Sequence, residues 1–200
     1  MGETPTKPGL DGVIAAAQAA QVPEAQANEA PDAAPRKRGL PPVHLWNPAH
    51  SGQIDIVIRK DGQWVHEGAV ISREALVRLF STILRKDPDG YWLVTPVEKL
   101  KIAVEDAPFV AVRVDRQGET LIFTTNLGDT VDAGPDHPIR VVIDPATGEP
   151  RPYVHVRADL EALITRPVFY ELAELAEERD GELAVASNGG WFSIGPAEAA

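Results

Sequence analysis

The chain has 200 residues, of which 44% are hydrophobic, carries a formal net charge of −11 and contains no cysteine. Apolar content of this size supports one compact domain or two small ones, whereas the absence of cysteine excludes disulfides, thiolate metal ligands and a cysteine nucleophile. The negative charge disfavours nucleic-acid binding, and the lack of both a secretory leader and an apolar run of about 20 residues predicts a cytoplasmic protein without a membrane span.

Residues 1–40 are rich in alanine, proline and glutamine and contain no large aromatic side chain. Such a segment cannot offset its ordering entropy by burial, so we expect a disordered leader. The alternative for part of it is an alanine-rich helix over residues 10–21 that serves as a docking element.

The elements after the leader form a first repeat domain at residues 41–100. Alternation of apolar and polar residues, together with turn and capping signals, predicts strands at 54–58 and 64–66, a helix from Ser72 to Lys86 and a strand at 91–95.

A second, α+β domain is expected at residues 101–195, followed by a frayed tail at 196–200. The same signals predict an antiparallel meander at 100–105, 109–115 and 121–125, strands at 139–143 and 153–155, a helix opening near Asp159, another from Pro167 and a closing hairpin at 183–194.

One arrangement recurs in the two domains. In each, a strand and a turn lead to an aromatic-Val-His strand and then to a helix, first at Trp64-Val65-His66 and again at Tyr153-Val154-His155. We therefore expect an α+β fold with duplicated hairpin, helix and hairpin units and mostly antiparallel sheets. Two units that each expose an apolar face should bury it against one another, which makes the seam between them the expected place for a site.

The best candidate site is the strand around residues 151–157. Alternation places Arg151, Tyr153, His155 and Arg157 on one face, where guanidinium groups, a phenol and an imidazole suit a small planar anion. The alternative is a solvated strand face whose arginines pair with the many carboxylates of this acidic chain.

Five further residues are weaker ligand-binding candidates. His66 occupies the place of His155 in the first repeat, and Lys99 precedes a strand. Asp106 is suited to hold a ligand hydroxyl or to cap a turn, and the same two roles stay open for Asn126 and Asp129 in their polar loop.

No recognised catalytic motif, phosphate-binding loop or paired-histidine metal motif occurs, so no catalytic residue, metal or cofactor is expected. Three functions stay open: a module that senses a small anionic, nucleotide-like ligand, a hydrolase of a phosphorylated compound that uses His155 with Asp106 or Asp129, and a scaffold for a protein partner. Nothing in the sequence specifies an oligomeric state.

Three stretches resemble the bacterial family called domain of unknown function 1285 (DUF1285). They are 91–99, the turn 106–109, and 151–157 followed by 160–164. The resemblance spans residues 41–195 and implies an α+β core with a structural duplication and a C-terminal part superficially like a pleckstrin-homology barrel. It also implies a suspected site for a nucleotide-like ligand at the interdomain seam and a suspected role in signal transduction.

Overall fold

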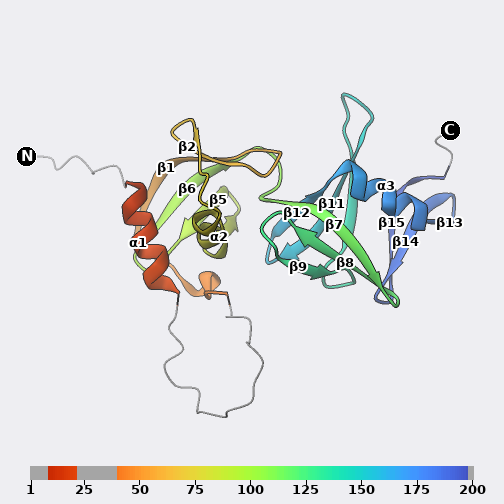
Figure 1. The fold of residues 1–200 in the computed structure, drawn as a ribbon, viewed down its shortest axis with the longest axis horizontal. Coiled ribbons are helices and arrows are strands. Elements are labelled where there is room, and N and C mark those ends of the chain that lie inside the picture. The colour runs from red at the N-terminus through yellow and green to blue at the C-terminus, as the bar shows by residue number, and fades with distance from the viewer. Residues whose placement is uncertain (1–8, 22–39, 198–200) are drawn as a thin grey trace, which may run out of the picture. The chain divides into compact units, whose positions relative to one another are not determined.

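The computed structural model describes residues 9–21 and 40–197, which form two compact units (Figure 1). The first unit runs to Val57 and includes Val65–Ala103, and the second takes Ile58–Trp64 and continues from Val104. Among the residues described, no helix is long and apolar enough to cross a bilayer. The rest of the expected leader and the last three residues of the expected tail lie outside the described residues.

The first unit contains a six-stranded sheet in the order β3-β2-β1-β6-β5-β4. Its elements are α1 (Leu10–Ala20), the 3-10 helix η1 (Val43–Leu45), β1 (His50–Ile58), β2 (Trp64–His66), β3 (Ala69–Val70), α2 (Glu74–Thr82), β4 (Leu84–Asp87), β5 (Gly90–Val94) and β6 (Glu98–Val104). Alternate residues of β1, namely Ile54, Ile56 and Ile58, are buried, because period two in a strand gives one apolar face. Phe80 of α2 is buried as well.

Two local expectations for this unit are corrected. Residues Leu10–Ala20 form a helix rather than part of a disordered leader, because Val13, Ala17 and Ala20 share one helical face and are buried. The expected helix to Lys86 ends at Thr82, and the next residues form β4, because Leu84 pairs with Leu93 of β5.

The second unit contains a six-stranded sheet in the order β10-β11-β12-β7-β8-β9 and a separate sheet β13-β14-β15. Its elements are β7 (Phe109–Gln117), β8 (Thr120–Thr125), β9 (Thr130–Asp132), β10 (Ile139–Ile143), β11 (Pro150–Arg157), β12 (Leu160–Ile164), α3 (Arg166–Leu175), β13 (Glu177–Arg179), β14 (Glu182–Ser187) and β15 (Gly190–Pro196). Its pairings are antiparallel except that β12 runs parallel to β7.

The helix expected to open near Asp159 is wrong. Residues Leu160–Ile164 form strand β12, in which Leu160, Ala162 and Ile164 are buried and alternate with less buried neighbours. A short apolar run fits a helix or a strand equally well, and pairing with both β11 and β7 decides for the strand.

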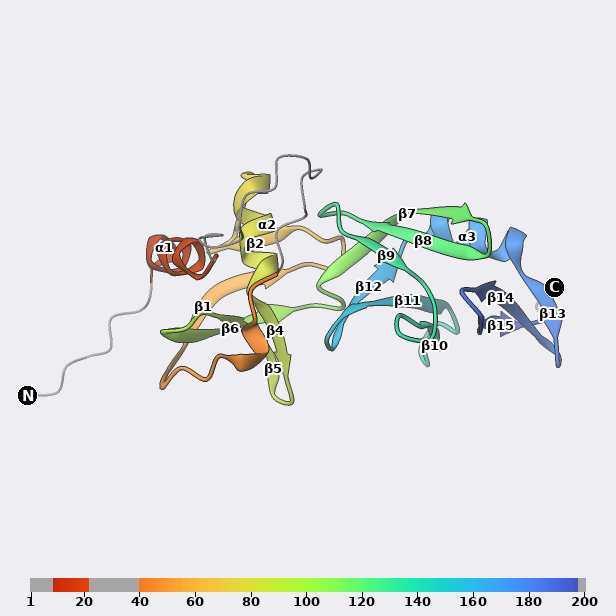
Figure 2. The same ribbon diagram turned by 90° about the horizontal axis from the view of Figure 1, so that it is seen from below.

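A duplication is visible in the order of the strands. Each six-stranded sheet has two three-stranded groups, and the first strand of the first group lies beside the last strand of the second: β1 beside β6, and β7 beside β12. The order β3-β2-β1-β6-β5-β4 thus recurs as β9-β8-β7-β12-β11-β10. The α+β fold with an internal duplication is confirmed, and the curled second sheet (Figure 2) is consistent with a pleckstrin-homology-like part.

The frame of this duplication differs from the expected one. The sequence matched the strand of residues 54–58 with that of 139–143, but in the sheets β10 takes the place of β4, and β11 that of β5. Leu84 pairs with Leu93 as Ile139 pairs with Val154, so His155 corresponds to Val94. The sheet order therefore does not relate His155 to His66.

Candidate functional site

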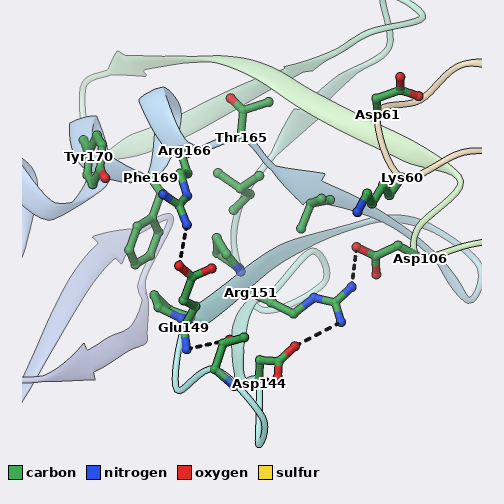
Figure 3. A pocket seen from close by; sticks show the side chains of 15 residues that line it. Lys60, Asp61, Asp106, Asp144, Glu149, Arg151, Thr165, Arg166, Phe169 and Tyr170 are labelled. Atoms are coloured by element: carbon green, nitrogen blue, oxygen red, sulfur yellow. Dashed lines mark hydrogen bonds and ion pairs between the residues drawn. The ribbon is translucent and has the colours of Figure 1, made fainter.

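A cavity of about 800 Å³ opens in the second unit (Figure 3). Its walls come from four segments: the turn after β1, the loop before β7, the β10–β11 hairpin, and the junction of β12 with α3. The lining residues are Lys60, Asp61, Asp106, Asp144, Thr147, Glu149, Pro150, Arg151, Pro152, Leu163, Ile164, Thr165, Arg166, Phe169 and Tyr170. Because β11 and β12 are antiparallel, the start of one and the end of the other meet at this cavity.

Arg151 is held in the cavity by carboxylates. Its Nη2 lies 2.7 Å from Oδ2 of Asp106 and its Nη1 lies 4.0 Å from Oδ2 of Asp144, while 42% of the side chain stays exposed. The hydrogen bond with Asp106 and the charge of that carboxylate raise the pKa of Arg151. The guanidinium is thus a fixed cation with one accessible side.

Tyr153 supports this arrangement from beneath the cavity. Its hydroxyl donates a hydrogen bond of 2.8 Å to Oδ1 of Asp106, whose other oxygen faces Arg151. Burial first, and then the bond to Asp106, raise the pKa of Tyr153 to about 12. The phenol therefore stays protonated at neutral pH and continues to orient the carboxylate.

The β10–β11 hairpin forms one wall and is shaped by its own carboxylate. Oδ1 of Asp144 accepts hydrogen bonds from the backbone N–H groups of Ala146 (2.8 Å) and Thr147 (3.2 Å), and these two donors lower the pKa of Asp144. Glu149 on the same hairpin pairs with Arg166 of α3 at 2.8 Å. These contacts hold the hairpin turn and connect it to α3.

Lys60 enters the cavity from a turn that is fastened to the second unit. Its backbone N–H donates to Oε2 of Glu105 at 3.0 Å, and Nδ2 of Asn126 donates to the carbonyl of Gly62 at 3.4 Å. Gly62 has φ +83°, and a Cβ on it would lie 2.6 Å from Nδ2 of Asn126, so only glycine fits there. The Lys60 ammonium has no ion-pair partner among the residues that the structure describes.

The opposite wall is aromatic. Phe169 and Tyr170 project from the first turns of α3, and Figure 3 shows them across the cavity from Lys60 and Asp106. Pro167 near the start of the helix suits this position, because it lacks the N–H that a first turn leaves unpaired. The cavity thus brings together the Lys60 ammonium, one half-exposed guanidinium and two aromatic rings.

The predicted site residues divide into separate places. Arg151 and Asp106 lie in the cavity, and Tyr153 contacts Asp106. Arg157 instead pairs with Asp129 at 3.2 Å. The structure therefore assembles part of the predicted strand face, and its arginines have carboxylate partners, as the alternative interpretation expected.

Two more predicted residues in this unit contact neighbours outside the cavity. Nδ1 of His155 lies 3.3 Å from Nδ1 of His137, and Oδ1 of Asn126 accepts a hydrogen bond of 3.0 Å from the backbone of Val110. In the part of the chain that the structure describes, no hydrogen bond or ion pair joins His155 to Asp106 or Asp129. The hydrolase hypothesis stays a prediction.

The other two predicted residues lie in the first unit. His66 ends β2, and Lys99 on β6 places its ammonium 3.5 Å from Asp87 and 4.3 Å from the centre of the Trp92 ring. Lys99 thus has partners within its own sheet. The expected site at a seam between the two domains stays a prediction.

Sequence reasoning missed Lys60, Glu149, Phe169 and Tyr170. The sequence predicts only a turn between the strands at 54–58 and 64–66, yet Lys60 in that turn is the single lysine of the second unit. That fact becomes informative only once the turn is known to belong to this unit. No group of three or more potential metal-ligating side chains occurs within residues 9–21 and 40–197.

The strand order and the cavity together define a two-unit α+β protein with an internally repeated sheet. The N-terminal domain model of DUF1285, a domain of unknown function, matches residues 41–107, and its C-terminal domain model matches residues 108–194. The chain therefore belongs to the DUF1285 family.

Two solved structures of that family resemble the chain. A DUF1285 family protein from Silicibacter pomeroyi is 48% identical, with a TM-score of 0.79, and the match covers 95% of this chain and 98% of that one. One from Shewanella baltica is 26% identical, with a TM-score of 0.48, over 60% of this chain and 90% of that one. Among curated proteins, none matches this chain.

Proposed function

We propose that the second unit is a noncatalytic module that binds and senses a small, ring-bearing anion of the nucleotide-like type. The observation that supports this most is the presence of the unpaired Lys60 ammonium, the fixed Arg151 guanidinium and the Phe169 ring in one cavity. A volume of about 800 Å³ is within the range of small-molecule sites. Ammonium and guanidinium groups bind phosphate or carboxylate, and an aromatic wall suits a planar base.

The balance of charge narrows the ligand class. The cavity has the three cations Lys60, Arg151 and Arg166 but four carboxylates, at Asp61, Asp106, Asp144 and Glu149. A polyanion would be repelled by this surplus, whereas a nucleoside monophosphate offers one anionic group and several hydroxyl donors that carboxylates accept. We therefore favour a ligand with a single phosphate or carboxylate and a hydroxylated ring.

The test is a thermal-shift screen of the full chain against nucleoside mono- and triphosphates, inorganic phosphate and dicarboxylates. A ligand at about 100 times its dissociation constant stabilises a fold by roughly 2.7 kcal/mol. We expect a monophosphate to raise the melting temperature of the natural chain and to have little effect on Lys60→Ala. Because Lys60 has no ion-pair partner in the described part of the chain, this substitution should leave the ligand-free melting temperature unchanged.

Arg59→Ala is the matched control, because it removes one positive charge from the neighbouring residue, which is exposed and does not line the cavity. Equal loss of the shift in both variants would contradict specific binding at the cavity. Turnover of the hit would select the hydrolase hypothesis. A screen without any hit, with a protein partner recovered instead, would select the scaffold.

A further inference from the structure

Two histidines of the second unit lie side by side away from the cavity. Nδ1 of His137, in the loop before β10, is 3.3 Å from Nδ1 of His155 on β11, and the two rings stack with their centres 5.3 Å apart. We propose that this pair is a binding site for a divalent transition-metal ion of the zinc class, in which both Nδ1 atoms are ligands.

The distance between the two nitrogens supports this assignment. Zinc binds histidine nitrogen at about 2.05 Å with tetrahedral angles, so two nitrogens on one zinc ion are about 3.3 Å apart. The Nδ1 atoms of His137 and His155 already have this separation. The same distance also fits a hydrogen bond between the two rings, so the titration described below decides between a metal and a shared proton.

The second nitrogen of His155 fixes the tautomer that a metal requires. Nε2 of His155 contacts the carbonyl oxygen of Ala158, which can only accept a hydrogen bond, so Nε2 carries the proton and Nδ1 keeps its lone pair. Metal-binding histidines commonly donate their other N–H group to a backbone carbonyl in this way. Ala158 adopts φ +46°, a left-handed conformation that is uncommon for alanine and that places its carbonyl in the β11–β12 turn.

The backbone holds both rings in place. Gly134 and His137 close a tight turn with two hydrogen bonds, from Gly134 N–H to the His137 carbonyl at 3.1 Å and from His137 N–H to the Gly134 carbonyl at 3.0 Å. The backbone N–H of His155 donates to the carbonyl of Pro138 at 3.0 Å. Rigid supports of this kind reduce the ordering entropy that a metal must offset.

The protein provides two imidazoles, and water or an external ligand fills the remaining positions. In the absence of metal, His137 donates its Nδ1 proton toward His155, whose backbone oxygen is 3.2 Å away. On binding, that proton moves to Nε2 of His137, and the metal takes its place between the two rings. A two-histidine site with open positions favours borderline cations over Mg²⁺ or Ca²⁺, which prefer oxygen ligands.

The test is calorimetric titration of the untagged full chain with Zn²⁺, and separately with Mg²⁺. We expect one Zn²⁺ per chain, no saturable binding of Mg²⁺, and at least a tenfold loss of Zn²⁺ affinity in both His137→Gln and His155→Gln. The double variant should show no saturable Zn²⁺ binding, because neither imidazole of the pair is left to bind the ion. His66→Gln in the first unit is the control and should bind as the natural chain does.

The His137→Gln variant is the more decisive of the two, because it leaves the contact between His155 and Ala158 in place. Without metal its melting temperature should fall only slightly, because partly exposed His137 loses one hydrogen bond to the His155 carbonyl, whereas the rise that Zn²⁺ causes should disappear. Binding that persists in the double variant, or that is lost equally in His66→Gln, overturns the proposal. So does a titration that shows no saturable Zn²⁺ site.

Discussion

The two six-stranded sheets place an arginine opposite an aromatic residue at equivalent positions. Arg85 of β4 pairs with Trp92 of β5, and Arg140 of β10 pairs with Tyr153 of β11. In the first sheet the cations near the aromatic ring are Lys99 and Lys101, whose ammonium groups lie 4.3 and 5.4 Å from the Trp92 ring centre. In the second sheet the arginine itself lies over the ring, at 4.5 Å from Tyr153.

The difference lies in what the arginine holds. Arg85 is only 14% exposed, and it donates to both oxygens of Asp87 and to the carbonyls of Val43 and Trp46 at 2.8 to 3.0 Å. It therefore fastens the segment around η1 to the sheet.

Arg140 makes a different set of contacts: it is half-exposed, donates to both oxygens of Glu161 at 2.5 and 2.6 Å, and lies over the Tyr153 ring. Tyr153 beneath it directs its hydroxyl to Asp106 at the cavity. Equivalent positions of the two sheets thus hold an arginine and an aromatic residue with different roles. In the first unit the arginine connects the segment around η1 to the sheet, and in the second the aromatic residue helps to shape the cavity.

The largest expected effect is at Arg85, whose side chain is 14% exposed. Arg85→Ala removes the donor to the carbonyls of Val43 and Trp46 and leaves Asp87 with the longer contact to Lys99 at 3.5 Å, so we expect the free energy of unfolding to fall by about 3 kcal/mol. Arg140→Ala should cost about 1 kcal/mol, because its partner Glu161 reaches solvent. Urea unfolding followed by circular dichroism measures both values. Equal losses would mean that the two positions are not energetically distinct.

The pKa of Asp87 provides an independent measurement of the same contact. Its hydrogen bond with Arg85 lowers this pKa below the usual 3.8. A carboxylate whose folded-state pKa is lowered stabilises the fold above pH 3.8 and loses that contribution as the pH falls through the lower value. Asp87→Asn should therefore flatten the acid limb of the stability profile, and an unchanged limb would contradict the contact.

The next effect concerns a turn in each unit that is closed by a buried threonine hydroxyl. Oγ1 of buried Thr95 accepts hydrogen bonds from the backbone N–H groups of Val97 and Glu98, and Oγ1 of buried Thr125 accepts them from Leu127 and Asp129. Replacing either threonine by valine keeps the shape and removes the acceptor, so each variant should lose about 1 to 2 kcal/mol. Serine at either position is the control and should retain most of the stability. A large loss at one site alone would show that only that turn depends on its hydroxyl.

A smaller effect is expected at Tyr153. Tyr153→Phe removes the donor to Asp106, which keeps Arg151, so we expect a loss of about 1 kcal/mol at neutral pH. Because the folded-state pKa of about 12 is above the ordinary 10.0, this contribution is complete below pH 10 and is lost as the pH rises through 12. The stability difference between the natural chain and Tyr153→Phe should therefore shrink in alkali. Ultraviolet titration should detect the late ionisation of Tyr153, and Tyr153→Phe should abolish that step.

Much of the fold could be predicted because local patterns determined it. The alternation of Ile54, Ile56 and Ile58 identified β1, and the alternation along β11 placed Arg151 and Tyr153 on one face. The resemblance to DUF1285 indicated the duplication. These features depend on periodicity and on short sequence motifs, and both can be recognised from residues that are close together in the sequence.

The remaining features depend on contacts between distant residues. Leu160–Ile164 is a strand only because it pairs with β7 and β11, and nothing in its own five residues favours this over a helix. The cavity could not be predicted for the same reason. Lys60 and Tyr170 are more than a hundred residues apart in the sequence, and only the topology of the sheet brings both to the walls of one cavity. Alternation predicts which face of a strand is apolar but not which strands lie beside it. For this reason the sequence matched β10 with β1, whereas the sheets match it with β4.

The smallest expected effect tests whether the length of an ion pair or its burial determines its contribution to stability. Arg113 and Asp115 on β7 have the same two-residue spacing as Arg85 and Asp87, and their ion pair is shorter, at 2.6 Å against 2.8 Å. The Arg113 side chain is 69% exposed, however, so water screens the pair and solvates each partner after the other is removed.

Arg113→Ala should accordingly change the free energy of unfolding by no more than about 0.5 kcal/mol. High salt should reduce even that difference, because exposed pairs are screened over about a Debye length. If Arg113→Ala costs as much as Arg85→Ala, then the length of the pair rather than its burial sets the energy. The contrast drawn between the two units would then have no physical basis.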